Sequence, residues 1–356
     1  MKRLEKQFVK AAGLLSTGLK VIGVYTFLRE LQKKRVIVLM YHGITRQHNP
    51  LSNFDQKHVQ HEKFEEQMKY LVQHYNLISL KDFMLWKQGE KKLPPKALLL
   101  TFDDGYRNVY TQLFPLFKKY QLPVTIFLPT QYLGKKGIGW YDIIPYCISK
   151  TNKKEMIVCD KKYNLCTEKD KISAILQLKI KARDHLLLQK KILDDVIKQT
   201  DTNPRKCSDD DFLYLSWKQC QEMQSSGAVF GSHSVTHQVM TMLNEDGIRN
   251  EMQKSKEKIE HELGGICVSF AYPFGDNNTV TRRILKQIGY RAGFSTRYGK
   301  NVKETEIFQL RRISVSNKYN LSIFILTLFF NFSSFHHGLI KLYAGVKNLI
   351  FPQPKV

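Results

Sequence analysis

The sequence is poor in cysteine and in acidic residues, and each shortage excludes a class of protein. Its 356 residues include six cysteines, none of them in a Cys-x-x-Cys pair, so a disulfide scaffold and a cysteine zinc site have no support. We expect reduced thiols in a reducing compartment. Lysine and arginine (56) outnumber aspartate and glutamate (32). The formal charge of +24 argues against an ordinary neutral secreted enzyme and favours nucleic acid, an anionic membrane surface or an anionic substrate as partner.

Nucleic-acid-binding modules, internal repeats and low-complexity tracts are also missing. The basic residues are spread along the chain without the basic and aromatic pattern of nucleic-acid-binding proteins, so we expect no nucleic acid partner. Hydrophobic residues make up 42% of the chain and charged residues 25%, which is typical of a globular protein and not of a disordered one. The length fits two domains, or one barrel of about 250 residues.

Apolar stretches at both ends of the chain predict contact with a membrane or with the core. Residues 11–28 are mostly apolar but carry Lys20 near their middle, which costs roughly 2.5–3.5 kcal/mol on insertion scales. An in-plane anchor, a spanning helix and a packed helix therefore stay open for an N-terminal segment over 1–35. In the C-terminal segment, 317–356, the apolar run at 321–332 is too short to span, and an apolar helical face follows at 339–350. We expect it either to close the core or to contact a membrane.

Between the ends, short apolar runs alternate with helical patterns. We expect seven strands, at 36–41, 97–102, 124–128, 228–231, 267–272, 290–295 and 311–315, and helices at 61–75, 109–120, 216–226, 245–263 and 280–289. Nearly continuous apolar strands separated by helices indicate a parallel sheet covered on both faces. Seven of them favour an α/β fold, a closed or nearly closed barrel over 36–316. A lysine-rich stretch at about 143–211, with one long helical pattern at about 168–199, is interpreted as an insertion after the third strand.

Polar clusters follow four of the expected strands at their carboxyl ends, where barrel enzymes place their active sites. They are His42-Gly43, Asp103-Asp104-Gly105, His233 to His237, and Pro273-Phe274-Gly275. Of two adjacent carboxylates, one can bind a metal while the other stays ionised as a base. Two histidines four residues apart can share that metal. Each pattern alone is weak, but together on successive strand ends they predict a metal-dependent active site.

These motifs together resemble the polysaccharide deacetylases of carbohydrate esterase family four, the NodB-like family. The matching segments are TFDDG (101–105), HSVTH (233–237) and AYPFG (271–275). VLMYHGI (38–44) and FEEQMKYL (64–71) are similar to the branch that includes the poly-N-acetylglucosamine deacetylases, in which the motif order is permuted. The resemblance covers roughly 36–142 and 212–316. It implies a distorted (β/α)7 TIM-like barrel that hydrolyses an N-acetyl group from an amino sugar.

The resemblance also implies catalytic roles for five residues. Asp104, His233 and His237 would hold a divalent metal, with zinc as the expected ion, and leave a position open for water and substrate. Asp103 would be the general base. His42 would protonate the leaving amine; the alternative for His42 is a buried histidine hydrogen-bonded under the barrel rim.

Substrate and oxyanion contacts are expected from two further motifs. The backbone N–H of Phe274 would stabilise the oxyanion together with the metal, and we place Tyr272 in the same substrate and oxyanion group. In GWYD (139–142), Trp140 and Tyr141 would stack on a sugar face and Asp142 would bond its hydroxyls. The alternative for this motif is an aromatic core at the barrel rim.

The sequence departs from the family pattern in two places. Many family members have an arginine in the third motif that steadies the base, and here that position is Ala271. We expect Arg312, at the end of the last strand, to reach the same carboxylate. The late-motif histidine is absent from LRRISV (310–315), which is expected only if His42 supplies it.

The leading interpretation is a metal-dependent hydrolase that removes an N-acetyl group from an amino sugar of a cell-envelope glycan. Basic segments are attracted to anionic lipid, so the apolar ends and the basic insertion favour membrane association and a lipid-linked or phosphate-bearing substrate. The free cysteines and the missing cleavage signal favour the cytoplasmic face of the inner membrane. The alternatives are a non-catalytic glycan-binding protein on the same barrel and a deformylase of a lipid-linked amino sugar. The sequence leaves the oligomeric state open.

Overall fold

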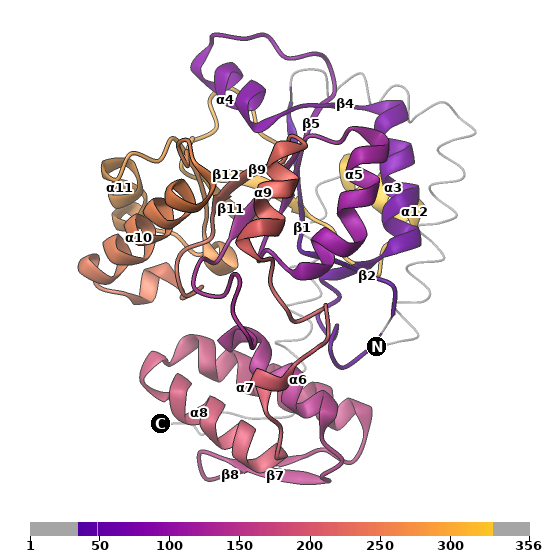
Figure 1. The fold of residues 1–356 in the computed structure, drawn as a ribbon, viewed down its shortest axis with the longest axis vertical. Coiled ribbons are helices and arrows are strands. Elements are labelled where there is room, and N and C mark those ends of the chain that lie inside the picture. Colours follow the sequence, from indigo (N-terminus) through magenta and orange to yellow (C-terminus); the bar gives the residue numbers. More distant parts are fainter. Residues whose placement is uncertain (1–34, 48, 330–356) are drawn as a thin grey trace, which may run out of the picture.

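Seven parallel strands close into a barrel in the computed structural model, which describes residues 35–47 and 49–329 (Figure 1). In spatial order the strands are β1 (Ile37–Tyr41), β12 (Leu310–Ser314), β11 (Ala292–Tyr298), β10 (Ser269–Ala271), β9 (Val229–Ser232), β6 (Val124–Leu128) and β5 (Ala97–Phe102). Leu39 of β1 pairs with Ile313 on one side and with Leu100 on the other, so β1 closes the ring. The expected seven-stranded (β/α)7 barrel is confirmed. The expected segments over 1–34 and 330–356 lie outside the described residues.

Helices cover the outside of the barrel close to the expected positions (Figure 1). They are α3 (His61–His74), the π-helical turn η1 (Val109–Leu113) with α5 (Phe114–Tyr120), α9 (Trp217–Ser225), α10 (Glu245–Leu263) and α11 (Thr279–Gln287). Side-chain caps set several of their first residues. At α9, for example, Ser216 and Gln219 form a reciprocal capping box, which satisfies two backbone N–H groups that the helix leaves open.

Shorter elements fill the connections between the barrel strands. β4 (Asn76–Leu77) pairs with Ala97 and Leu98 at the start of β5, and β2 (Gly43–Thr45) pairs with β3 (His58–Gln60). Three 3-10 turns are η2 (Pro204–Lys206), η3 (Met240–Met242) and η4 (Pro273–Gly275). The last of these carries the third motif at the carboxyl end of β10.

The barrel strands are buried on both faces, which explains why they appear as continuous apolar runs. Every residue of β1, β5 and β6 is buried. One set of alternating side chains, including Val38, Leu99 and Phe127, packs with Phe83 of α4 (Leu80–Gln88), a helix that lies at one end of the barrel (Figure 1). The other set packs against the outer helices. Parallel sheets require cover on both faces, and this chain supplies it.

The insertion forms a lobe at the end of the barrel toward which the strands' carboxyl ends point (Figure 1). Its elements are α6 (Trp140–Lys150), the hairpin β7 (Glu155–Val158) and β8 (Lys161–Asn164), α7 (Glu168–Asp184) and α8 (Leu186–Thr200). One long helix was expected over about 168–199, and that expectation is wrong because the chain breaks at His185. The break lets α7 and α8 pack against each other, so that Leu178 of α7 and Ile192 of α8 lie in one core.

The apolar run after the last strand forms α12 (Leu321–Phe329), and its side chains are buried. Phe324 and Leu328 belong to the main core, and α12 contacts α3. Of the two alternatives for this stretch, a helix that closes the core holds over 321–329. In the described part of the chain, no helix combines the length and the apolar character that a membrane span requires.

The packing of α12 predicts a large effect at Phe324, which is fully buried. Phe324→Ala removes the ring and leaves a cavity, so we expect the free energy of unfolding to fall by about 3–5 kcal/mol in denaturant titration. Leu187→Ala on α8 is the control, because Leu187 is 98% exposed, and it should change the free energy by less than about 0.5 kcal/mol. Equal values for the two variants would contradict the packing of α12.

Candidate metal centre and active site

Asp104, His233 and His237 come together at the carboxyl ends of β5 and β9. Asp104 Oδ1 lies 3.4 Å from His233 Nε2 and 3.2 Å from His237 Nε2. All three side chains are buried, and one ligand atom from each lies within 4.8 Å of the other two. Within residues 35–47 and 49–329 they form the one cluster of this kind. Three ligands with a further position open are typical of a catalytic metal site.

Two features of the hydrogen bonding show that these residues fit a divalent cation. Asp104 Oδ1 is buried and has no hydrogen-bond partner, which is costly for a carboxylate oxygen unless a cation is its partner. The Nδ1 of His233 lies 2.7 Å from the carbonyl oxygen of Ala271. Donation from Nδ1 to that carbonyl leaves the Nε2 lone pair directed at the shared point, the outer contact usual for a metal-binding histidine.

The electrostatics of the two imidazoles differ. Burial lowers the pKa of His237 to about 4, so this imidazole is neutral and available as a ligand. Burial also lowers the pKa of His233, but the carboxylates of Asp104 and Asp103 outweigh it and raise the pKa. The negative charges of the two aspartates that stabilise a proton on His233 would equally stabilise a metal cation bound between these groups.

The loops that carry these residues have strained backbone. Four residues without the freedom of glycine adopt a positive φ: Asp104 (70°), Ser234 (68°), His237 (60°) and Phe274 (58°). Each such conformation costs roughly 1–3 kcal/mol and persists only where the surroundings enforce it. The loop of the second motif is enforced by Glu251 of α10, whose carboxylate accepts hydrogen bonds from the amides of residues 235 and 236 at 2.9 and 2.8 Å.

Asp103 is held by Arg312, as the sequence analysis expected. The guanidinium donates two hydrogen bonds of 2.7 Å to the two carboxylate oxygens, and both side chains are buried. Burial raises the pKa of the Asp103 carboxyl, but the charge of Arg312 outweighs it and holds the pKa below its usual value. Arg312 thus makes the expected contact with the carboxylate of Asp103, which the short side chain of Ala271 cannot make. Asp103 is therefore ionised and fixed in orientation beside the cluster.

His42 follows β1 at the same end of the barrel. Its Nδ1 is buried without a hydrogen-bond partner, so the expected alternative of a hydrogen-bonded structural histidine receives no support at this atom. Burial lowers the pKa of His42, while the charges of Asp104 and Asp103 act in the opposite direction. The ring is therefore neutral near pH 7 and lies within the field of both aspartates.

Asp142 and Tyr272, for which substrate roles were expected, are both buried and make contacts within the protein. Asp142 is 2% exposed; its Oδ1 accepts from Lys57 at 3.0 Å and its Oδ2 from Tyr106 at 2.5 Å. Both oxygens are thus engaged within the protein, and the expected contact of Asp142 with sugar hydroxyls stays a prediction. Tyr272 is fully buried, and its hydroxyl donates to the carbonyl of Phe308 at 3.0 Å while its amide donates to Phe294. Both of its donors are used inside the barrel wall.

Trp140 and Phe274 lie at the junction of the insertion and the barrel. The indole N–H of Trp140 donates to the carbonyl of Thr236 at 3.1 Å, and its ring centroid lies 6.0 Å from that of Phe274. Trp140 is 9% exposed, so most of it packs as the alternative of an aromatic rim predicts. Phe274 is half-buried and also contacts the ring of His237 at 4.9 Å. The insertion therefore packs on the loops that carry the ligand and the oxyanion motif.

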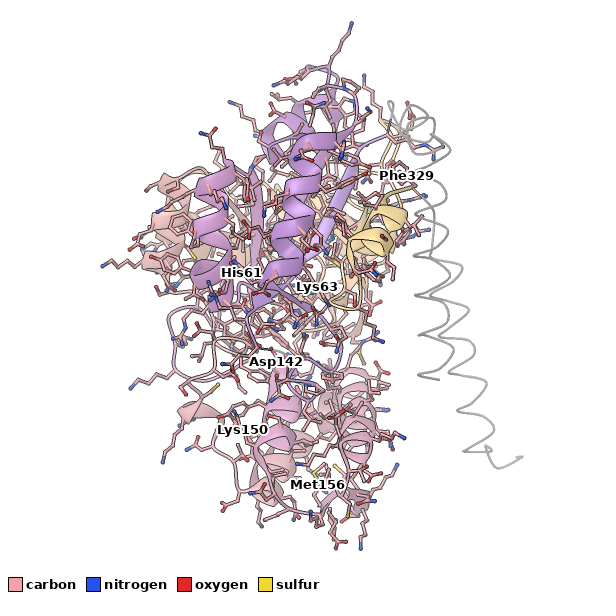
Figure 2. All side chains as sticks on the ribbon, turned by 90° about the vertical axis from the view of Figure 1, so that its right-hand side faces the viewer. His61, Lys63, Asp142, Lys150, Met156 and Phe329 are labelled. Carbon is pink, nitrogen blue, oxygen red and sulfur yellow. The ribbon has the colours of Figure 1, made fainter. Side chains whose placement is uncertain are left out.

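Lys57 is a site residue that sequence reasoning missed. Its ammonium pairs with Asp142 and lies 3.7 Å from Asp104 Oδ2, so it faces the oxygen of Asp104 that does not point at the histidines. It also lies over the ring of Tyr106 at 4.7 Å. Asp142, labelled in Figure 2, lies between barrel and lobe. Lys57 stands in the irregular segment before β3 and belongs to no motif. Of the two residues, only Tyr106 had a sequence feature that could have indicated the site, because it directly follows TFDDG.

The cluster predicts tight metal binding that depends on its own ligands. We expect the full chain to bind one Zn²⁺ in calorimetry, and His237→Gln to weaken binding by more than about 100-fold, because even outer contacts of metal ligands contribute about 10–100-fold. His261→Gln is the matched control, since the side chain of His261 is 79% exposed on α10. A His237→Gln variant that binds as tightly as the His261→Gln variant would exclude this centre.

Comparisons with known proteins agree with the fold and the motifs. Residues 90–293 match the polysaccharide deacetylase family. The putative polysaccharide deacetylase YxkH of Bacillus subtilis is 22% identical over 280 residues, which cover 78% of this chain and 71% of YxkH. Poly-beta-1,6-N-acetyl-D-glucosamine N-deacetylases of Staphylococcus aureus are 30% identical over 136 residues. That alignment covers 35% of this chain and 45% of the staphylococcal enzyme, less than half of either.

Solved structures share the fold at low identity. The Streptococcus pyogenes deacetylase PplD, in complex with acetate, superposes with a TM-score of 0.57 at 19% identity and covers 82% of this chain and 97% of its own. IcaB from Ammonifex degensii gives 0.55 at 19% identity, over 83% of this chain and 98% of IcaB. The family match extends over more than half of the 356 residues and includes the aspartate and histidine motifs at the barrel mouth. The chain therefore belongs to the polysaccharide deacetylase family.

Proposed function

We propose that this protein is a metal-dependent N-deacetylase of N-acetylglucosamine polymers or oligomers in the cell envelope. The observation that carries the proposal is that two adjacent aspartates have different surroundings, one suited to a metal ligand and the other to a general base. Asp104 faces the two histidines, and Asp103 is held ionised by Arg312. The named substrate of the staphylococcal relatives, poly-beta-1,6-N-acetyl-D-glucosamine, supports this class of polymer.

The reaction breaks the amide C–N bond and yields acetate and a free amine. A divalent ion held by Asp104, His233 and His237 supplies a Lewis acid, and two imidazoles with one carboxylate favour zinc. Asp103 accepts the proton of the attacking water, since its pair with Arg312 keeps it ionised. His42, which is neutral before the reaction, would take up the proton released from that water and pass it to the leaving nitrogen, which must become an amine before it departs.

The oxyanion of the tetrahedral intermediate needs a donor fixed in advance. The amide of Phe274 supports this role, because the positive φ of Phe274 gives this turn an unusual orientation beside the ligand cluster. The ring of Phe274 contacts His237 and the guanidinium of Arg183 at 5.3 Å. Arg183 in turn pairs with Asp276 at 2.8 Å. The insertion thus holds the loop that presents this amide.

Membrane association is a second part of the proposal. The apolar stretches at 11–28 and 339–350 and the net charge of +24 support it, because basic segments are attracted to anionic lipid. The six free cysteines favour the cytoplasmic face. A lipid-linked amino sugar is then a natural substrate for an enzyme placed at a bilayer.

Release of acetate tests the catalytic proposal. Metal-loaded full-length protein is incubated with β-1,6-linked N-acetylglucosamine oligomers and with a lipid-linked amino sugar, and the products are analysed by mass spectrometry. We expect one acetyl group to be lost per deacetylated residue, and chelation to stop the reaction. Loss of a formyl group instead would identify a deformylase. Binding of oligomers without release of any acid would identify a glycan-binding protein.

Replacing Arg312 is expected to change both the rate of deacetylation and the pH dependence of that rate. In Arg312→Gln the burial of Asp103 acts without the opposing charge, so the pKa of the base rises and the acid limb of the pH–rate profile moves to higher pH. We expect kcat at neutral pH to fall by about 10²–10⁴-fold, the usual contribution of a positioned base.

Two variants control this measurement. Asp103→Asn should abolish activity at every pH, and Arg311→Gln should retain it because Arg311 is exposed. Circular dichroism establishes that each variant is folded. An unchanged rate in Arg312→Gln beside an inactive Asp103→Asn would refute the role of Arg312.

A further inference from the structure

A basic pocket lies where the two ends of the described chain meet. It has a volume of about 570 Å³ and is lined by the connection between β11 and β12, by Arg35 and by Phe329. Arg35 is the first described residue and Phe329 the last. Phe329 lies well away from Asp142 at the catalytic site (Figure 2). The pocket is therefore separate from the metal centre.

Cations dominate the lining of this pocket. Arg35, Arg297, Lys300 and Arg311 face two acidic residues, Glu304 and Glu306, which leaves a formal charge of 4 − 2 = +2. Glu306 is already paired with Arg282 at 3.2 Å. In the described part of the chain none of the four cations takes part in an ion pair. The two glutamates only partly offset the four cations, and the net positive charge that remains attracts an anion.

The pKa of Lys300 is affected by its burial and by the neighbouring cation. Its ammonium donates to the carbonyl of Phe329 at 3.3 Å, a neutral partner. Burial and, as the smaller cause, the charge of Arg35 together lower the pKa of Lys300 to about 8. An anion placed between Lys300 and Arg35 would offset both effects and hold the lysine protonated.

The surroundings of the pocket favour an amphiphilic anion. Tyr298, Val302 and Phe329 also line it, so apolar walls stand beside the cations. Through Arg35 and Phe329 the chain continues into its two apolar stretches, at 11–28 and 339–350. The first of these is joined to the pocket by a basic segment that contains Arg29, Lys33 and Lys34. Cations next to apolar segments match a phosphate that carries acyl chains, whereas a soluble phosphate makes no use of apolar walls.

We propose that this pocket binds the phosphate of an anionic phospholipid and so fixes which face of the barrel lies on a membrane. The proposal adds a lipid site to the proposed function and is independent of the catalytic assignment. Its test therefore measures binding, and its failure leaves deacetylation untouched.

The first measurement compares two double variants of the full chain with equal changes in charge. Arg297→Gln/Lys300→Gln removes two cations from the pocket. Lys169→Gln/Lys190→Gln removes two exposed cations from the insertion lobe. Each cation near an anionic surface contributes about fivefold in affinity, so we expect the pocket variant to bind phosphatidylglycerol vesicles about 25-fold more weakly in sedimentation. The lobe variant should bind as the unmodified chain does.

Both variants should release acetate from soluble oligomers at the unmodified rate, because neither pair touches the site. Equal vesicle binding by the two double variants would overturn the proposal.

The second measurement locates the ligand at Lys300. A pKa of about 8 makes this amine reactive toward acylating reagents near neutral pH, and mass spectrometry reads the modification. We expect phosphatidylglycerol vesicles to protect Lys300, and phosphatidylcholine vesicles and inorganic phosphate to leave it reactive. Equal protection by inorganic phosphate alone would assign the pocket to a soluble anion, and no protection by any probe would exclude a ligand there; either result overturns the proposal.

Discussion

The buried ion pair between Arg312 and Asp103 is the contact on which the barrel mouth depends. Arg312 stands on β12, donates to the carbonyl of Ser295 on β11 at 2.9 Å, and reaches past β1 to the loop that follows β5. One guanidinium thus joins three segments of the barrel wall. Neither charge is tolerable without the other, because removing one partner of a buried pair costs about 3–5 kcal/mol. The fold therefore enforces an ionised carboxylate at the position where we propose the general base.

The strained backbone of the site is also maintained by buried contacts between distant segments. Asp104, Ser234, His237 and Phe274 adopt conformations that residues with a side chain usually avoid. They are held there by buried contacts outside the ligand set, such as the carboxylate of Glu251 beneath the histidine loop. The buried contacts of the barrel wall thus offset the cost of the unfavourable backbone conformations and keep the three candidate ligand atoms close together. This distribution agrees with the general finding that strain gathers at functional sites.

The parts of this protein that are encoded locally could be predicted from the sequence. The seven strands are recognisable because parallel strands covered on both faces appear as continuous apolar runs. The candidate metal ligands were indicated by the resemblance of their motifs to a known family, because the spacing of the two histidines is a weak signal by itself. Contacts between distant segments left no such signal. Asp142 looked free in GWYD, and its partner Lys57 is 85 positions away in no motif. The break at His185 depends on the core that α7 and α8 share. The orientation of the Tyr272 side chain depends on the hydrogen bond that its hydroxyl donates to the carbonyl of Phe308.

Closure of the ring by its first strand has a consequence for how the protein is made. β1 ends at Tyr41, and its partner β12 begins at Leu310, so the seam joins residues that leave the ribosome far apart in time. Contacts of such long sequence separation are slow to form. Until β12 is synthesised, the edge of β1 that it will cover is an unpaired template for other strands. A nascent chain of this architecture is therefore expected to benefit from a chaperone until β12 has been translated.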